Sequence, residues 1–118
     1  MKVAHYNEVK PLPPEILGIK GSHLMSIRPL INNRDGAQGF SMSLLSLSPS
    51  GHTPSHRHQR EEEVFVKSGT GMIRTETGEF RICQGSTVYI APDEIHQFVN
   101  DGPEDLELLC LTTIEKGP

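Results

Sequence analysis

The chain has 118 residues, of which 35% are hydrophobic and 22% charged, and its formal net charge at pH 7 is −4. This length fits a single globular domain, and the composition excludes a disordered chain. No apolar run approaches the roughly 20 residues of a membrane-spanning helix. No lysine and arginine cluster exceeds two residues, so we expect neither nucleic acid nor a membrane as a partner. The N-terminus lacks the apolar stretch of a secretory signal, which predicts a cytoplasmic location.

The first 17 residues differ in character from the rest of the chain. Residues 1–17 contain three prolines and no clear hydrophobic period, and we interpret them as an N-terminal arm that packs over the domain or reaches a partner subunit. Residues 18–118 form the predicted domain, in which short β-rich segments alternate with turn signals at the spacing typical of sandwiches and barrels. The predicted strands are Ser22–Arg28, a segment around Phe40, Met42, Leu44 and Leu47, then Glu62–Lys67, Met72–Glu76, Glu79–Cys83, Val88–Ile90, Gln97–Asn100 and Leu106–Ile114.

Local irregularities refine this pattern. The apolar alternation changes phase at Leu44-Leu45, which predicts a β-bulge, and Pro49-Ser50-Gly51 predicts a turn. No stretch of a dozen residues has a helical period. Eight to ten short strands without a long helix favour an all-β closed barrel or jelly roll, which removes exposed sheet edges.

The two cysteines, Cys83 and Cys110, are far apart and lie in no CxxC motif, so we expect small buried residues and no thiolate metal site.

A histidine pair and a carboxylate lie at the start of one predicted strand. His56 and His58 are two residues apart, so in an extended chain both imidazoles point to the same side. Glu62 follows, with the same parity as the valines that alternate after it. Choosing Glu63 instead would turn Lys67 into the barrel. Parity therefore favours Glu62 as a metal ligand, although a bulge would reverse the choice in favour of Glu63.

A second segment brings a third histidine. Residues 85–96 predict a turn, a buried strand and another turn that ends at His96. Together the two segments resemble the two signature motifs of the cupin superfamily, at about residues 50–69 and 85–100, and most closely those of small single-domain cupins of the conserved-barrel type. Ala91 and Asp93 stand where this family has proline and glycine. The positions that fit the motifs are His56, His58, Glu62 and Gly69 in the first, and Gly85, His96 and Asn100 in the second.

The resemblance implies a double-stranded β-helix, or jelly-roll, barrel with one divalent transition metal held by His56, His58, Glu62 and His96. Mixed nitrogen and oxygen ligands suit Mn, Fe, Ni, Cu or Zn without choosing among them. It further implies a homodimer and a small-molecule ligand or substrate. We expect a metal-dependent oxidoreductase or lyase, dioxygenase-like, with His52 as a candidate proton carrier. The alternative is a non-catalytic module that binds or senses a small ligand or metal.

Each candidate ligand also has an ordinary structural interpretation. The His56 and His58 pair fits two surface histidines on an exposed strand, and His96 fits a histidine that satisfies the hydrogen bonds of a turn. Glu62 fits a solvated acid in the run Glu61–Glu63. The joint spacing of the two motifs favours the metal site over these three separate explanations.

Overall fold

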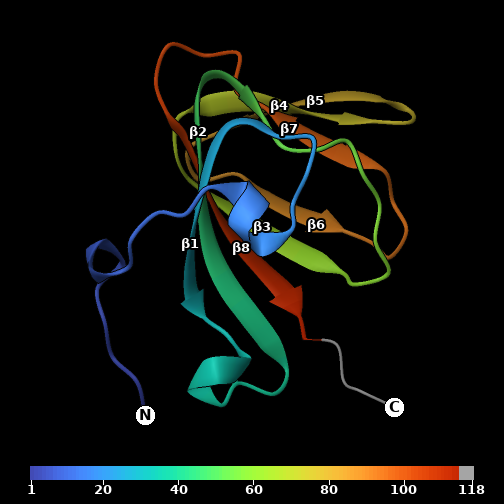
Figure 1. Ribbon diagram of the computed structural model, residues 1–118. Helices are drawn as coiled ribbons and strands as arrows, with labels where there is room; N and C mark the ends of the chain where they lie inside the picture. The colour runs from blue at the N-terminus through green and yellow to red at the C-terminus, as the bar shows by residue number, and fades with distance from the viewer. Residues whose placement is uncertain (115–118) are drawn as a thin grey trace.

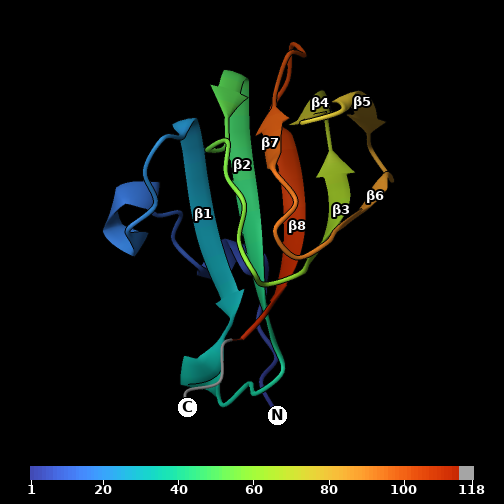
Figure 2. The same ribbon diagram turned by 90° about the vertical axis from the view of Figure 1, so that its right-hand side faces the viewer.

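The computed structural model describes residues 1–114 and shows one curled antiparallel β-sheet of eight strands (Figures 1 and 2). The strand order is β5-β4-β7-β2-β8-β3-β6, and β1 pairs with β2 beside that path. This arrangement confirms the predicted all-β jelly-roll barrel. The strands are β1 (His23–Ile31), β2 (Phe40–His52), β3 (Glu62–Ser68), β4 (Thr70–Thr75), β5 (Gly78–Cys83), β6 (Thr87–Ile90), β7 (His96–Val99) and β8 (Leu106–Thr113).

Helical structure among residues 1–114 is limited to three short 3-10 turns, η1 (Tyr6–Glu8), η2 (Pro14–Leu17) and η3 (Asn33–Asp35). None of these is long and apolar enough to cross a membrane. The last four residues of the predicted domain, 115–118, lie outside the described residues.

The barrel interior is filled by apolar side chains that alternate along the strands. On β3, Val64 and Val66 are buried, whereas Phe65 between them is exposed. Successive side chains of a strand point to opposite faces, so the packing of the two valines also fixes which way Glu62 points. The buried core consists of Leu47, Val64, Val66, Ile73, Ile82, Ile90, Phe98, Leu106, Leu108 and Cys110.

The long strand β2 corrects two predictions. Its pairing with β8 runs without a break from Phe40 to Leu47, so the bulge predicted at Leu44-Leu45 is absent. Leu44 and Leu47 are both buried although they point to opposite faces, because each face of β2 is covered. The register shifts lie instead in the pairing of β2 with β1. One falls between Leu47 and His52, where the additional residues belong to β2, and the other between Pro29 and Ile31, where the additional residue belongs to β1. The segment Pro49-Ser50-Gly51, predicted as a turn, lies inside β2, and hydrogen bonds with Asn100 continue the strand to His52. Its backbone is nevertheless irregular, because Ser50 has a φ of +73° and the register with β1 shifts here.

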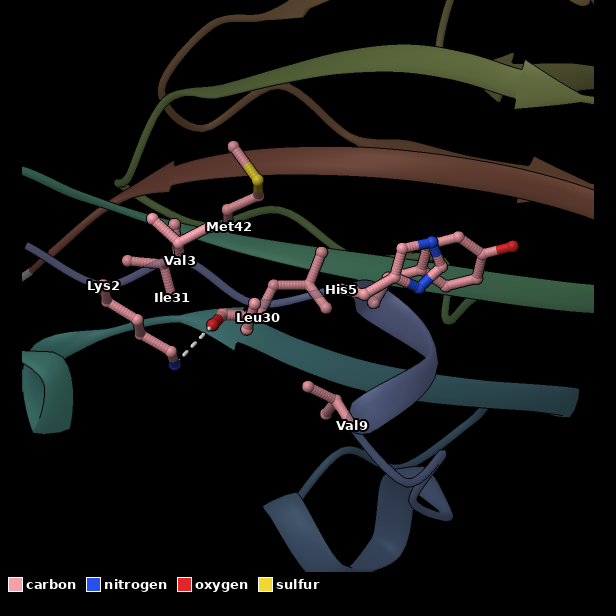
Figure 3. Close-up of a pocket in the computed structure, with 9 residues that line it drawn as sticks. Lys2, Val3, His5, Val9, Leu30, Ile31 and Met42 are labelled. Atoms are coloured by element: carbon pink, nitrogen blue, oxygen red, sulfur yellow. Dashed lines mark hydrogen bonds between the residues drawn. The ribbon is translucent and has the colours of Figure 1, made fainter.

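The N-terminal arm packs against the edge of β1. Leu12 and Ile27 form an isolated antiparallel bridge, in which each backbone N–H donates to the other residue's carbonyl oxygen at 2.8 and 3.0 Å. Nearer the N-terminus, the Lys2 ammonium group donates to the carbonyl oxygen of Leu30 at 3.0 Å (Figure 3). The arm therefore covers part of the domain that bears it.

Asn100 fixes the end of the strand that begins at His96. Its side chain is fully buried, and its amide group donates to the carbonyl oxygens of Leu47 and Glu104, each at 2.8 Å. Its side-chain oxygen accepts a hydrogen bond from the backbone N–H of Gly102 at 3.0 Å. Since these bonds join β7 to β2 and to the β7–β8 connection, they hold β7 in register beside the site.

Candidate metal centre

Two connections that are far apart in sequence lie side by side and bring the histidines together (Figure 2). His56 is in the β2–β3 connection and His96 begins β7. Their backbones form an isolated antiparallel bridge, with N–H to carbonyl distances of 3.0 and 3.2 Å. The backbone N–H of Asp93 donates to the carbonyl oxygen of His58 at 2.7 Å and joins the same two connections again. The two sequence motifs are thus hydrogen-bonded to each other at the backbone.

The three imidazole rings converge on one point. Ring centroids lie 4.7 Å apart for His56 and His96, and 5.0 Å apart for the other two pairs. One ligand nitrogen from each of His56, His58 and His96 lies within 4.8 Å of the other two. Ligands of a metal at about 2.0–2.1 Å are separated by no more than about 4.2 Å when they are opposite each other. The separations therefore suit one metal ion after small ring movements.

Hydrogen bonds set the tautomers of two of these rings. The Nδ1 atom of His58 lies 2.6 Å from the carbonyl oxygen of Arg60, and the Nδ1 atom of His96 lies 2.8 Å from that of Glu94. A carbonyl oxygen only accepts, so each Nδ1 carries the proton and donates it. The lone pair of each ring is then on Nε2, the atom available to a metal.

Glu62 points at the same two Nε2 atoms. Its Oε1 lies 3.5 Å from Nε2 of His58 and 3.6 Å from Nε2 of His96, and its side chain is 12% exposed. Glu63 is exposed. The direction of the two glutamates is the one that strand parity predicts, because Glu62 shares the face of Val64.

The charges of the cluster are coupled. Burial alone would raise the pKa of Glu62, but the hydrogen bond and charge of His96, with the charge of His58, lower that pKa below its usual value. Burial alone would lower the pKa of His96, and its bond to Glu62 instead raises it. Burial and the two neighbouring histidines lower the pKa of His56. The site thus combines a carboxylate with at least one imidazole that favours the neutral, metal-binding form.

A cavity of about 610 Å³ opens onto the cluster. This volume falls in the range of roughly 300–1,000 Å³ typical of small-molecule sites. Its walls combine apolar and polar side chains from strands β1, β2, β3, β7 and β8, from the β2–β3 connection and from the end of the arm. The apolar and sulfur-containing residues among its lining are Leu17, Ile19, Met25, Ile27, Leu45, Phe98 and Cys110.

Two features of this cavity were not expected from the sequence. The end of the arm and the following residues, 17–20, line it; the sequence predicted an arm that packs over the domain or reaches a partner subunit, but not its contact with this cavity. The Cys110 thiol is buried against Glu62, and burial raises its pKa well above the ordinary value. Cys83, by contrast, is exposed on the edge strand β5, which corrects the prediction that both cysteines are buried. The burial of Cys110 could have been predicted from the alternation of every second residue along β8.

His52 lies apart from the three histidines. It pairs with Val99 across the sheet, so it points to the face opposite that of Phe98. Its Nδ1 lies 3.0 Å from the carbonyl oxygen of Thr53, and its ring is 5.8 Å from that of His23. Among the described residues it is not part of the cavity lining. A role in proton transfer stays a prediction, and the geometry gives His52 no direct contact with the metal cluster.

Comparison with known families identifies the barrel. Residues 43–112, more than half of the chain, match the model of the cupin domain. The chain belongs to the cupin family. Cupins commonly bind a metal, and the three histidines of this cupin are placed to hold one.

Several known proteins are similar to this cupin. The polyketide cyclase RemF from Streptomyces resistomycificus is 29% identical with a TM-score of 0.89, and the match covers 100% of this chain and 82% of that one. Auxin-binding protein 1 of Arabidopsis thaliana is 30% identical over 112 residues, or 87% of this chain and 56% of the relative. A predicted oxalate decarboxylase from Thermotoga maritima is 18% identical with a TM-score of 0.83, covering 97% of this chain and 100% of that one, and shows the shared fold alone. The chain spans 45–63% of the length of the curated relatives that it matches.

Proposed function

We propose that this cupin is a metal-dependent enzyme that acts on a small, largely apolar organic molecule held in the barrel cavity. The observation that supports this most directly is that Oε1 of Glu62 lies 3.5 Å from Nε2 of His58 and 3.6 Å from Nε2 of His96 at the wall of the cavity. Glu62 is the proposed fourth ligand beside His56, His58 and His96. Its negative charge offsets one of the two charges of a divalent ion.

The residues around the site define what the chain itself contributes. Three neutral imidazoles and one carboxylate leave one or two ligand positions for substrate in a five- or six-coordinate metal, and Mn, Fe, Ni, Cu and Zn all accept this ligand set. When bound, the metal polarises a substrate oxygen or, if it is redox-active, activates dioxygen. Phe98, Ile27 and Leu45 exclude water from the site and position the apolar part of the substrate.

The reaction class that we propose is an oxidoreductase or a lyase, including dioxygenase-like chemistry. The similarity to a polyketide cyclase over the whole of this chain supports catalysis on a carbon skeleton within such a barrel. The test is to load the protein separately with Mn, Fe, Ni, Cu and Zn and to incubate it with a panel of ketones, phenols and organic acids. Oxygen uptake, carbon dioxide release and product NMR are the measurements. Turnover must require metal and disappear in His58→Ala.

A non-catalytic binding module is the alternative function. The similarity to auxin-binding protein 1, whose name assigns it a binding role, favours this alternative. It predicts that the metal-loaded protein binds members of the same panel in calorimetry and returns every one unchanged. Stoichiometric binding without turnover for all five metals would replace the enzyme proposal by this one.

A homodimer is a further part of the proposal. Apolar side chains on the outer face of the sheet, including Phe40, Phe65 and Tyr89, are 47–62% exposed, and surfaces of this kind are typical of protein–protein contacts. Light scattering coupled to size exclusion at several protein concentrations measures the assembly. A monomer at the highest concentration would contradict it.

A further inference from the structure

Two further histidines lie beside each other on the outside of the barrel, where β1 begins and β2 ends (Figure 2). His23 and His52 are directly opposite each other in the antiparallel ladder of these strands, and side chains in such positions have Cβ atoms about 4.5–5.5 Å apart. Their ring centroids are 5.8 Å apart, slightly more than the 4.7 and 5.0 Å within the metal cluster. His52 lies on the face opposite that of Phe98, so this pair is separate from the cavity.

A hydrogen bond orients the His52 ring in the way that a metal ligand requires. Its Nδ1 lies 3.0 Å from the carbonyl oxygen of Thr53, so Nδ1 carries the proton and the lone pair is on Nε2. The amide group of Gln97, 3.4 Å from the same Nδ1, has this carbonyl oxygen as its closer partner at 3.1 Å. Two histidines of the cluster have the same type of bond, which fixes a ring and makes its other nitrogen a better ligand.

The backbone that brings the two rings together is strained. Leu24, which follows His23, has a φ of +52°, and Ser50 has a φ of +73°. The left-handed region costs a residue other than glycine about 1–3 kcal/mol, and strain of this kind gathers at ligand sites. Gly51 lies so close to β1 that an added Cβ would be 2.9 Å from the carbonyl oxygens of both His23 and Leu24. The register shift of β2 at this point therefore holds His52 opposite His23.

We propose that His23 and His52 form a second metal site, which takes a divalent transition ion of the kind that imidazole binds, such as Zn, Cu or Ni. Nε2 of His52 and one ring nitrogen of His23 bind the ion, and water fills the remaining positions. His23 is exposed, so its ring is free to turn toward the fixed ring of His52. The proposal is independent of the proposed function, because the pair lies on the other face of the sheet.

This site is weaker than the cluster inside the barrel. Each missing ligand lowers the affinity by at least about 100-fold, and the pair has two ligands where the cluster has four. It therefore fills only at metal concentrations far above those that saturate the barrel, and the purified protein still carries about one metal per chain.

An ion at this position would join β1 to β2 through their side chains. Met25 and Ile27 of β1 line the cavity, as does Thr53, which follows His52. The ion thus fixes, from outside, a strand that forms one wall of the cavity. Because the two rings meet only when the strands are paired, binding stabilises the paired state.

The test is a calorimetric zinc titration of the full chain after one equivalent of zinc has been added. We expect a second event with one ion per chain and a dissociation constant below about 1 mM. His23→Ala and His52→Ala should each weaken this event more than about ten-fold and leave the first unchanged. The matched control is His5→Ala, because His5 is an exposed histidine whose ring stacks on Tyr6 of the arm. Magnesium should give no second event, because it prefers oxygen ligands.

NMR identifies the ligands without any substitution. The ring signals of His23 and His52 should shift with the second event and not with the first, and circular dichroism establishes that each variant is folded. Three results would overturn the proposal: no second event up to about 1 mM zinc, a second event that both variants retain, or an equal loss in His5→Ala. If the barrel cluster binds no zinc, the event of the pair should still be observed and still be lost with either substitution, so failure of the proposed metal centre is distinguishable from failure of this site.

Discussion

Replacing His58 by alanine should remove a metal ligand with little change in the stability of the metal-free protein. The His58 side chain is 22% exposed and lies in a connection rather than in the core. Its internal hydrogen bond is the one from Nδ1 to the carbonyl oxygen of Arg60, and the net loss from such a bond is about 1 kcal/mol. His96 is 3% exposed and packs inside the barrel, so its removal also leaves a cavity. His58→Ala is therefore the variant whose metal-free form stays closest to the wild type.

The size of the effect follows from linkage. A metal at 100 times its dissociation constant stabilises the native state by about 2.7 kcal/mol. For a domain of this size, about 3–5 °C of melting temperature corresponds to 1 kcal/mol, so zinc raises the wild-type melting temperature by about 8–14 °C. Loss of a residue that only hydrogen-bonds to a metal ligand weakens metal binding by up to about 100-fold. We therefore expect the loss of a ligand itself to weaken metal binding by at least about 100-fold. At the same zinc concentration the variant then gains about 0.4 kcal/mol or less, which is about 1–2 °C.

Scanning calorimetry with zinc and with a chelator measures these shifts, and elemental analysis of the purified proteins measures occupancy. His23→Ala is the control, because His23 is an exposed histidine on β1 that is not in the cluster. It should retain the full zinc-dependent rise and about one metal per chain. An equal zinc-dependent rise in His58→Ala and the wild type, with equal metal content, would refute the assignment of His58 as a ligand.

Three further predictions concern the barrel itself. Gly69→Ala should lower the free energy of unfolding, measured in urea, by more than about 2 kcal/mol, because its φ is +90° and an added Cβ would clash with the backbone oxygen of Asp105. Gly85→Ala has the same φ but lies in open space, and should cost about 1 kcal/mol. Burial alone would raise the pKa of Glu107, but the hydrogen bonds from Lys67 and Ser68 outweigh it and lower that pKa. Glu107→Gln should therefore lower the free energy of unfolding by about 0.5–1 kcal/mol at pH 7. In urea titrations this difference from the wild type should vanish as the pH falls from about 5 through the pKa of Glu107 in the folded protein. Iodoacetamide should label one thiol of the native chain, Cys83, and also Cys110 only after denaturation, as mass spectrometry can check; rapid native labelling of both would contradict the buried position of Cys110.

The direction of a side chain could be predicted from the sequence wherever it follows from the two-residue alternation of a strand. The two-residue alternation of β3 places Val64 and Val66 inside, and Glu62 lies on their side of the strand. The strands around this segment were also predicted to within a few residues. Such predictions succeed because one buried face constrains every second residue, and a shift by one residue would expose the whole set.

Features that depend on distant partners were not predictable in this way. Pro49-Ser50-Gly51 has the composition of a turn, yet hydrogen bonds to Asn100 keep it in β2. Leu44 breaks the alternation of β2 because both faces of that strand are covered. Residues 17–20 line the cavity after the bridge between Leu12 and Ile27 has joined the arm to β1. In each case tertiary contacts override the local preference of the chain.

The hydrogen bonds of the metal cluster tie the site to the fold as a whole. Nδ1 of His58 is anchored within the β2–β3 connection and Nδ1 of His96 within the β6–β7 connection. Backbone bonds made in the closed barrel join these connections, among them the bridge between His56 and His96. The unfolded chain therefore has no preformed ligand set, so the free energy of metal binding adds directly to that of folding. A domain of this size has little stability to spare, and for this reason we expect a bound metal ion to raise the temperature at which the barrel unfolds.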